Sequence, residues 1–255
     1  MNQRNFEYLK DQLKNTGFGQ ELSEQLLSSM QKRLVAFSLQ YKARFGGDEL
    51  TVSLNFQRSA KQEMYFFNSY LASLKNQDQS QKINQLFYVR PAGSITLKEA
   101  FNLLQGRAVE KQFVNRQGEP YRAWVQLDFK NTDLEGNFKI RQFHQSYGYD
   151  LSDQVSRLSL KELEDDLSKS RLLDSLRGGN RQQVTLLDQG QQHKFYIEAS
   201  PQFKAIIAYD QNSVRSQIHT VAKPEQGRQE TAHQQVPAEE AQRLTRQKQQ
   251  FLSPG

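Results

Sequence analysis

Two neighbouring segments carry the side chains with the clearest chemical potential in this chain. In segment 121–129 the apolar residues alternate, so the single tryptophan, Trp124, points to the opposite side of the predicted strand. Segment 138–143 is a second predicted strand whose basic and aromatic residues share one face. If the two strands pair, they present a basic and aromatic surface. The predicted site consists of Arg122, Trp124, Lys139, Arg141 and Phe143.

Surfaces of this composition have two common partners. Aromatic rings stack on nucleobases while arginine and lysine hold phosphates. Aromatic and arginine anchors are equally typical of protein interfaces. We therefore predict binding of nucleic acid or of a protein partner at this surface. The alternative is that another part of the chain covers the face, which would make Trp124 an ordinary core residue.

No other residues form a recognisable catalytic or metal-binding pattern. The chain has no cysteine, and its histidines, His144, His193, His219 and His233, have no second ligand at a metal-binding spacing. The densest acidic cluster comprises Glu162, Glu164, Asp165 and Asp166. Acidic residues are favoured in the first turn of a helix, so we interpret this cluster as a solvated helix start. Dinucleotide, phosphate-loop and hydrolase motifs are missing from the sequence. We expect a non-enzymatic protein without cofactor or metal.

The elements that position these residues follow from the apolar periodicity. Residues 3–16 and 20–32 have helical spacing and a short glycine-containing joint, so they predict a helical hairpin. Residues 35–45 and 50–56 alternate with period two around a glycine turn, which predicts a β-hairpin. Residues 63–74 are apolar on both faces and predict a central strand.

The same order of elements recurs along the chain. A helix ended by glycine and followed by antiparallel strands begins near residues 20, 96 and 160, and the last of these helices is expected from Ser159. The predicted class is therefore α+β, with an N-terminal helical hairpin followed by helix-plus-meander modules. We expect modules at 1–93, 94–158 and 159–210, then a mostly disordered tail at 211–255 with a helix at 237–252.

Composition points to a cytoplasmic location and against a membrane. The N-terminal residues lack the apolar region of a signal peptide, and no apolar run approaches the length of about 20 residues that spans a bilayer. The net charge of +6 is a mild basic balance that favours polyanionic partners only slightly.

Segments 2–10, 95–109, 121–128 and 194–204 together resemble an uncharacterised Bacteroidetes family associated with conjugative and other mobile elements. The resemblance covers most of residues 1–210. It implies a context of plasmid or transposon biology, and it supplies no catalytic or binding residues.

Two functional hypotheses follow. The first is an accessory protein of a mobile element that contacts DNA or a DNA-processing partner through the Trp124 surface, with the tail as a tether. The second is a protein–protein module, a scaffold or an inhibitor of a host system, that acts through the tail helix or a sheet edge.

Overall fold

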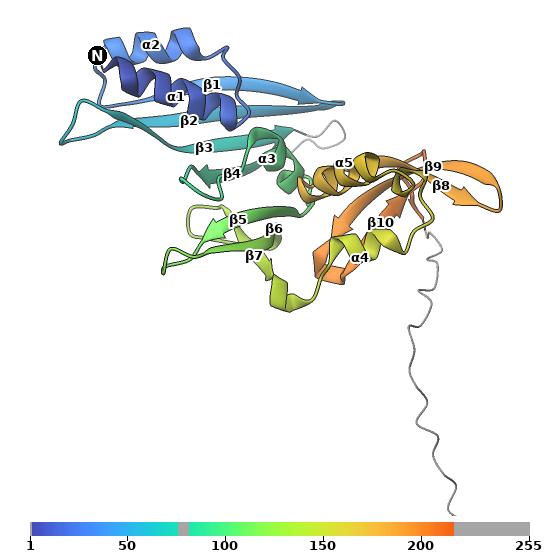
Figure 1. Cartoon of the computed structure of the whole chain (residues 1–255). Helices are drawn as coiled ribbons and strands as arrows, with labels where there is room; N and C mark the ends of the chain where they lie inside the picture. The colour runs from blue at the N-terminus through green and yellow to red at the C-terminus, as the bar shows by residue number, and fades with distance from the viewer. Residues whose placement is uncertain (1, 76–81, 217–255) are drawn as a thin grey trace, which may run out of the picture. The chain divides into compact units, whose positions relative to one another are not determined.

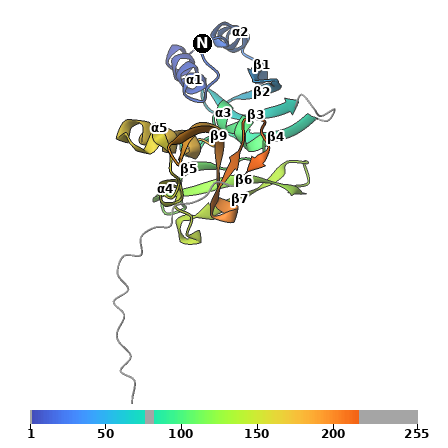
Figure 2. The same ribbon diagram turned by 90° about the vertical axis from the view of Figure 1, so that its right-hand side faces the viewer.

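The described part of the protein is an α+β fold, as predicted. A computed structural model describes residues 2–75 and 82–216. These residues contain five α-helices and eleven antiparallel strands in three sheets (Figures 1 and 2). They belong to one compact unit. The predicted helix at 237–252 and the tail beyond residue 216 lie outside the described residues.

The first sheet, sheet A, has the strand order β1-β2-β3-β4 and is packed against the N-terminal helices. Its elements are α1 (Gln3–Asn15), α2 (Ser23–Gln31), β1 (Ala36–Phe45), β2 (Asp48–Arg58), β3 (Tyr65–Lys75) and β4 (Lys82–Tyr88). The predicted hairpins are both present, and β3 is central as expected. The side chain of Asn2 accepts a hydrogen bond from the Asn5 N–H and so caps α1.

The second sheet, sheet B, has three strands in the order β5-β6-β7 and follows a short helix. Its elements are α3 (Leu97–Leu104), β5 (Val109–Val114), β6 (Pro120–Thr132) and β7 (Phe138–His144). Thr96 and Glu99 form a capping box at the start of α3. The helix therefore begins where the sequence predicts.

The third sheet, sheet C, has the order β11-β10-β9-β8. The elements of this region are η1 (Gln145–Tyr147), α4 (Leu151–Ser156), η2 (Lys161–Leu163), α5 (Asp166–Arg177), β8 (Gln182–Asp188), β9 (Gln191–Ser200), η3 (Pro201–Phe203), β10 (Ala205–Tyr209) and β11 (Arg215–Ser216). The regular helix predicted from Ser159 begins only at α5. The Asp165 side chain accepts a hydrogen bond from the Ser168 N–H and so caps the helix at that point. Helix α4 was not predicted, and β11 extends the structured part past residue 211.

Two apolar cores lie on opposite sides of sheet B. Val125 and Leu127 of β6 belong to the core shared with α1, α2, α3 and sheet A. Trp124, on the other face of β6, belongs to the core shared with α4, α5 and sheet C. Each core therefore contains residues from two of the predicted modules. The module boundaries remain a prediction as domain limits.

Candidate functional site

The predicted pairing of segments 121–129 and 138–143 is present as the β6–β7 ladder. Trp124 lies directly opposite Phe143, Gln126 opposite Arg141, and Asp128 opposite Lys139. The alternation along β6 places Trp124 and Val125 in different cores, as strand parity requires. The structure thus brings the predicted residues of the two strands to one face of sheet B.

That face is not an open surface at Trp124, so the tryptophan of the predicted site is not available to a ligand. Trp124 is only 4 % exposed and packs among the leucines of α5. Tyr149 covers the indole edge-on at a centroid distance of 5.5 Å. Phe143 is half-buried against the same core and contacts Tyr147. The aromatic members of the predicted site are therefore packing residues, which is the alternative that the sequence left open.

The basic residues of the predicted site, Arg122, Lys139 and Arg141, differ in their surroundings. The Arg141 guanidinium forms an ion pair with Asp128 at 2.7 Å. Hydrogen bonds from Asn131 and then from Arg141 hold the pKa of the Asp128 carboxyl at about 2. Arg122 on the central strand β6 and Lys139 on the edge strand β7 are both exposed, and Arg122 forms an ion pair with Glu110 at 3.9 Å. Without an open aromatic surface beside them, these cations do not form a stacking site.

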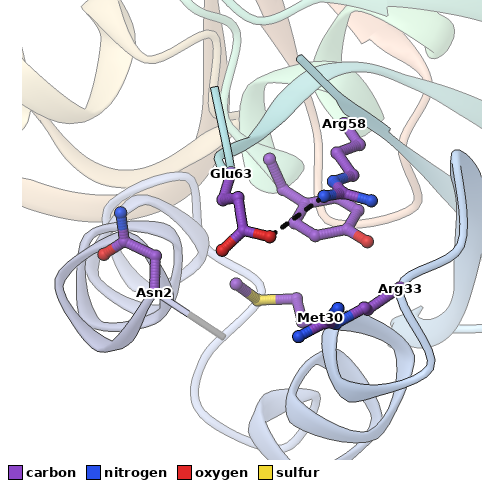
Figure 3. A pocket seen from close by; sticks show the side chains of 6 residues that line it. Asn2, Met30, Arg33, Arg58 and Glu63 are labelled. Atoms are coloured by element: carbon purple, nitrogen blue, oxygen red, sulfur yellow. Dashed lines mark hydrogen bonds and ion pairs between the residues drawn. The ribbon is translucent and has the colours of Figure 1, made fainter. Parts of the chain in front are cut away.

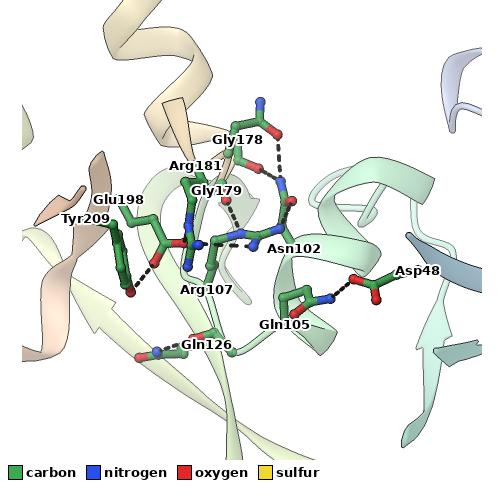
Figure 4. Close-up of polar contacts among 12 residues, drawn as sticks. Asp48, Asn102, Gln105, Arg107, Gln126, Gly178, Gly179, Arg181, Glu198 and Tyr209 are labelled. Atoms are coloured by element: carbon green, nitrogen blue, oxygen red, sulfur yellow. Dashed lines mark hydrogen bonds and ion pairs between the residues drawn. The ribbon is translucent and has the colours of Figure 1, made fainter. Parts of the chain in front are cut away.

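A second cluster of charged residues joins α3, sheet B and sheet C (Figure 4). The Arg107 guanidinium donates to the Asn102 side-chain oxygen at 2.6 Å and to the Gly179 carbonyl at 2.9 Å. It also lies 3.8 Å from the Glu198 carboxylate. Burial lowers the pKa of Arg107 although Glu198 opposes the change.

Glu198 has further partners on its own side of the cluster. Arg181 donates to one carboxylate oxygen at 2.6 Å, and the Tyr209 hydroxyl donates to the other at 3.1 Å. The Arg181 guanidinium also lies over the Tyr209 ring. Each of these charged groups has a partner within the cluster. The arrangement therefore fastens the segments to one another and leaves no charged group of the cluster ready for a ligand.

A small pocket lies where the N-terminus of α1 meets the end of α2 and the β2–β3 turn (Figure 3). Its volume is about 20 Å³, which is room for about one water molecule. Arg58 and Glu63 form an ion pair at 3.3 Å across it. The pocket is too small for an organic ligand.

Sheet A has a face turned away from α1, α2 and α3, here called the open face (Figure 2). Leu50, Val52 and Leu54 of β2 point to the core, so the intervening residues point outward. The strand registers place the outward residues in four rows. These rows are Ser38, Asn55, Ser69 and Tyr88; Gln40, Ser53, Leu71 and Leu86; Lys42, Thr51, Ser73 and Asn84; and Arg44, Glu49, Lys75 and Lys82.

Hydroxyl and amide groups connect the middle strands of the open face. Ser38 donates to Asn55 at 2.9 Å, and Asn55 donates to Ser69 at 3.3 Å. Gln40 donates to Ser53 at 2.9 Å in the next row. The middle of the face is thus polar, with Ser38 and Gln40 exposed, Ser53 and Asn55 half-buried, and Ser69 buried.

The two ends of the open face differ in character. One end carries four cations, with Glu49 of β2 as the only acidic residue of the four rows. The cations are Lys42 and Arg44 of β1, Lys75 of β3 and Lys82 of β4. Among the described residues, none of these four cations has an ion pair within 4.0 Å. They form what we call the basic end.

At the other end the open face carries exposed aromatic rings. Phe66 is 44 % and Tyr88 is 57 % exposed. The register shift between Asn55 and Phe56 leaves Asn68 as an extra residue on β3. A shallow hollow of about 460 Å³ opens beside this bulge, lined in part by Asn55, Gln57 and Asn68. We call this region the aromatic end.

Comparison with family models, curated proteins and solved structures found no match to this chain. The resemblance to a mobile-element family therefore stays a prediction.

In the described part of the chain, no helix combines the length and the apolar character needed to cross a bilayer. In the same residues, no group of three or more histidine or acidic side chains is arranged to hold a metal ion.

Sequence reasoning missed the open face, although its signal was present. The alternation in 35–45 already separates Ser38, Gln40, Lys42 and Arg44 from the core residues. The four-row arrangement depends on strand pairing, which the residue pattern of one strand does not contain.

Proposed function

We propose that this protein is a non-enzymatic binding protein that holds single-stranded nucleic acid on the open face of sheet A. The observation that carries the proposal is the arrangement of that face. Cations gather at one end, exposed aromatic rings lie at the other, and hydrogen-bonding side chains lie between them. This combination is the one that non-specific single-strand binders use.

The basic end supports contact with phosphates. Arg44 on β1 lies in the same row as Lys75 on β3 and Lys82 on β4, and Lys42 lies in the adjacent row. Neutralising phosphates with such cations releases counterions, so affinity falls as salt rises, with a slope of about −0.7 per contact for single strands. The net charge of +6 has the sign that such an interaction needs.

The aromatic end supports stacking. Phe66 and Tyr88 offer ring surface on the same face as the polar rows, and each base stacked on an aromatic ring contributes about 1–3 kcal/mol. A single strand fits this arrangement better than a duplex, because only unpaired bases expose their ring faces to a flat sheet. The accessory role in a mobile element implied by the resemblance is compatible with this activity and is part of the proposal.

The test is a titration of a fluorescein-labelled single-stranded oligonucleotide with the full chain, followed by fluorescence anisotropy at several salt concentrations. We expect binding at low salt that weakens as salt rises. Unlabelled single strand should compete better than unlabelled duplex. Failure to bind the single strand at low ionic strength would reject the proposal.

Variants locate the interaction on the open face. The double variant Lys42→Ala with Arg44→Ala should weaken binding and lower the salt slope by about 1.4, which is 0.7 for each lost contact. Phe66→Ala with Tyr88→Ala should weaken binding with little change in the slope.

The matched control removes two positive charges elsewhere on the domain. Arg4 and Lys14 are exposed on α1, which packs against the opposite face of sheet A. Arg4→Ala with Lys14→Ala should leave affinity nearly unchanged. An equal loss in this control would show attraction to net charge alone and would contradict a site on the open face.

A further inference from the structure

Strand β1 is an edge of sheet A with a long unpaired side. It runs ten residues in uninterrupted register with β2, from Ala36 opposite Gln57 to Phe45 opposite Asp48. Two other sheet edges are partly covered. The Leu86 N–H of β4 donates to the Asn137 side chain, and the Leu187 N–H of β8 donates to the Ser159 carbonyl. No comparable hydrogen bond to the outer side of β1 is formed by any other described residue.

The ladder identifies which backbone groups of β1 are free. The Arg58 N–H donates to the Val35 carbonyl at 2.8 Å, so these two residues form a hydrogen-bonded pair. Hydrogen-bonded and non-hydrogen-bonded pairs alternate along an antiparallel ladder. The odd-numbered residues of β1 therefore bond to β2, and the even-numbered residues direct N–H and C=O outward. The outward residues are Ala36, Ser38, Gln40, Lys42 and Arg44.

The side chains of β1 also alternate, with the odd-numbered residues facing the core and the even-numbered residues facing the open face. Phe37, Tyr41 and Phe45 point toward the core but are only partly buried, because they lie at the edge of the sheet. Val35, just before the strand, is 73 % exposed. A strand added to β1 would cover this apolar border if its own core-facing residues were apolar. Its residues on the open face would also have to carry no positive charge opposite Lys42 and Arg44.

We propose that the partner of this edge is β1 of a second copy, paired antiparallel about a two-fold axis that passes through Gln40. In this register Ser38 faces Lys42 of the second copy, Ala36 faces Arg44, and Gln40 faces Gln40. All five outward residues of each strand are then paired. A shift that centres the axis on Lys42 places two lysines opposite each other, and like charges directly opposite are unfavourable.

The core-facing side chains match in the same register. Val35 faces Phe45 of the second copy, Phe37 faces Ala43, and Leu39 faces Tyr41, so every pair is apolar. The pattern of β1 is therefore complementary to itself on both faces of the sheet, which a two-fold interface requires. Paired side chains point to one side, so the open faces of the two copies become a single continuous face. The dimer is independent of what that face binds.

The test measures the mass of the full chain over a range of concentrations by sedimentation equilibrium, for the wild type and two variants at one position. Gln40→Pro removes an outward N–H without removing a bond to β2, and proline is tolerated at such edge positions. Gln40→Ala removes the side chain and keeps the N–H. We expect dimers for the wild type and Gln40→Ala, and monomers for Gln40→Pro with an unchanged circular dichroism spectrum.

A charge pair tests the register without altering the backbone. Ser38→Lys brings a cation opposite Lys42 of the second copy and should weaken the dimer about three- to tenfold. Ser38→Glu should tighten it by a similar factor. Amide exchange gives a third measure, because the even-numbered amides of β1 should be protected only in the dimer. A wild-type monomer at all concentrations overturns the proposal, and so does a dimer unaffected by Gln40→Pro or by the Ser38 pair.

Discussion

The indole of Trp124 packs edge-on against the phenol ring of Tyr149, with the ring centroids 5.5 Å apart and the ring planes at 71°. The contact joins β6 to the segment that follows η1. The Tyr149 hydroxyl is held in turn by the Ala205 carbonyl at 3.4 Å, and burial raises the pKa of this phenol. Tyr149 is thus one of the side chains that close the face of β6 opposite Val125.

Replacement of this indole should therefore damage stability. Trp124→Ala removes a large side chain from a closed core, and we expect a loss of about 3–5 kcal/mol in the free energy of unfolding, measured with urea. Because Trp124 is the single tryptophan, wild-type fluorescence reports on this site alone. Acrylamide should quench it weakly in the folded state and strongly in urea. Strong quenching in the folded protein would contradict the packing.

Arg107 should be the most sensitive member of the charged cluster. Its side chain is 14 % exposed, and Arg107→Ala leaves the Asn102 oxygen and the Gly179 carbonyl without their donor. We expect a loss of about 3 kcal/mol from the free energy of unfolding. The control Arg58→Ala breaks an exposed pair with Glu63 and should cost less than about 1 kcal/mol. Equal losses in the two variants would show that burial of the cluster does not matter.

Two glycines with similar positive φ angles separate conformational strain from steric overlap. Gly179 has φ +77°, and a Cβ there would lie 2.7 Å from the Ala108 carbonyl oxygen. Gly190 has φ +80° with open space around it. Gly190→Ala should cost about 1–2 kcal/mol from the left-handed backbone alone. Gly179→Ala should cost about 1–3 kcal/mol more because the chain must move. Thermal unfolding of both variants measures the difference.

Asp128 should make stability depend on pH in the acid range. Its pKa in the folded protein is about 2, below the value of about 3.9 for an unfolded aspartate. The folded state therefore favours the ionised carboxyl. Its stabilising contribution is complete above pH 4 and is lost as the pH falls toward 2. Asp128→Asn should flatten this part of the stability profile, measured by urea unfolding between pH 2 and pH 5. An unchanged profile would contradict the low pKa.

The sequence predicted the local elements well because their signals are local. The glycine stops, the Thr96 cap and the alternation in 35–45 each specify one element, and those elements are present. The start of α5 was misplaced because leucines of helical spacing extend upstream of it. In that stretch Leu160 instead forms a β-bridge with Leu186, a contact between residues distant in the chain.

A related reason explains why the sequence pattern did not decide whether Trp124 is covered. The parity of β6 correctly placed Trp124 opposite Val125, but parity does not say what covers a face. The cover comes from Leu172 and Leu176 of α5, about fifty residues later. On the open face, by contrast, the sequence pattern did not predict the basic end. Arg44 and Lys82 lie in one row only because three consecutive strand pairings bring β1 to β4 into register.

Strand β6 contributes Val125 to one apolar core and Trp124, its immediate neighbour, to the other. Unfolding of either core would expose one face of β6 to solvent and would so weaken the other core. The described residues, 2–75 and 82–216, should accordingly lose their structure in a single cooperative transition, even though their three sheets follow one another along the chain.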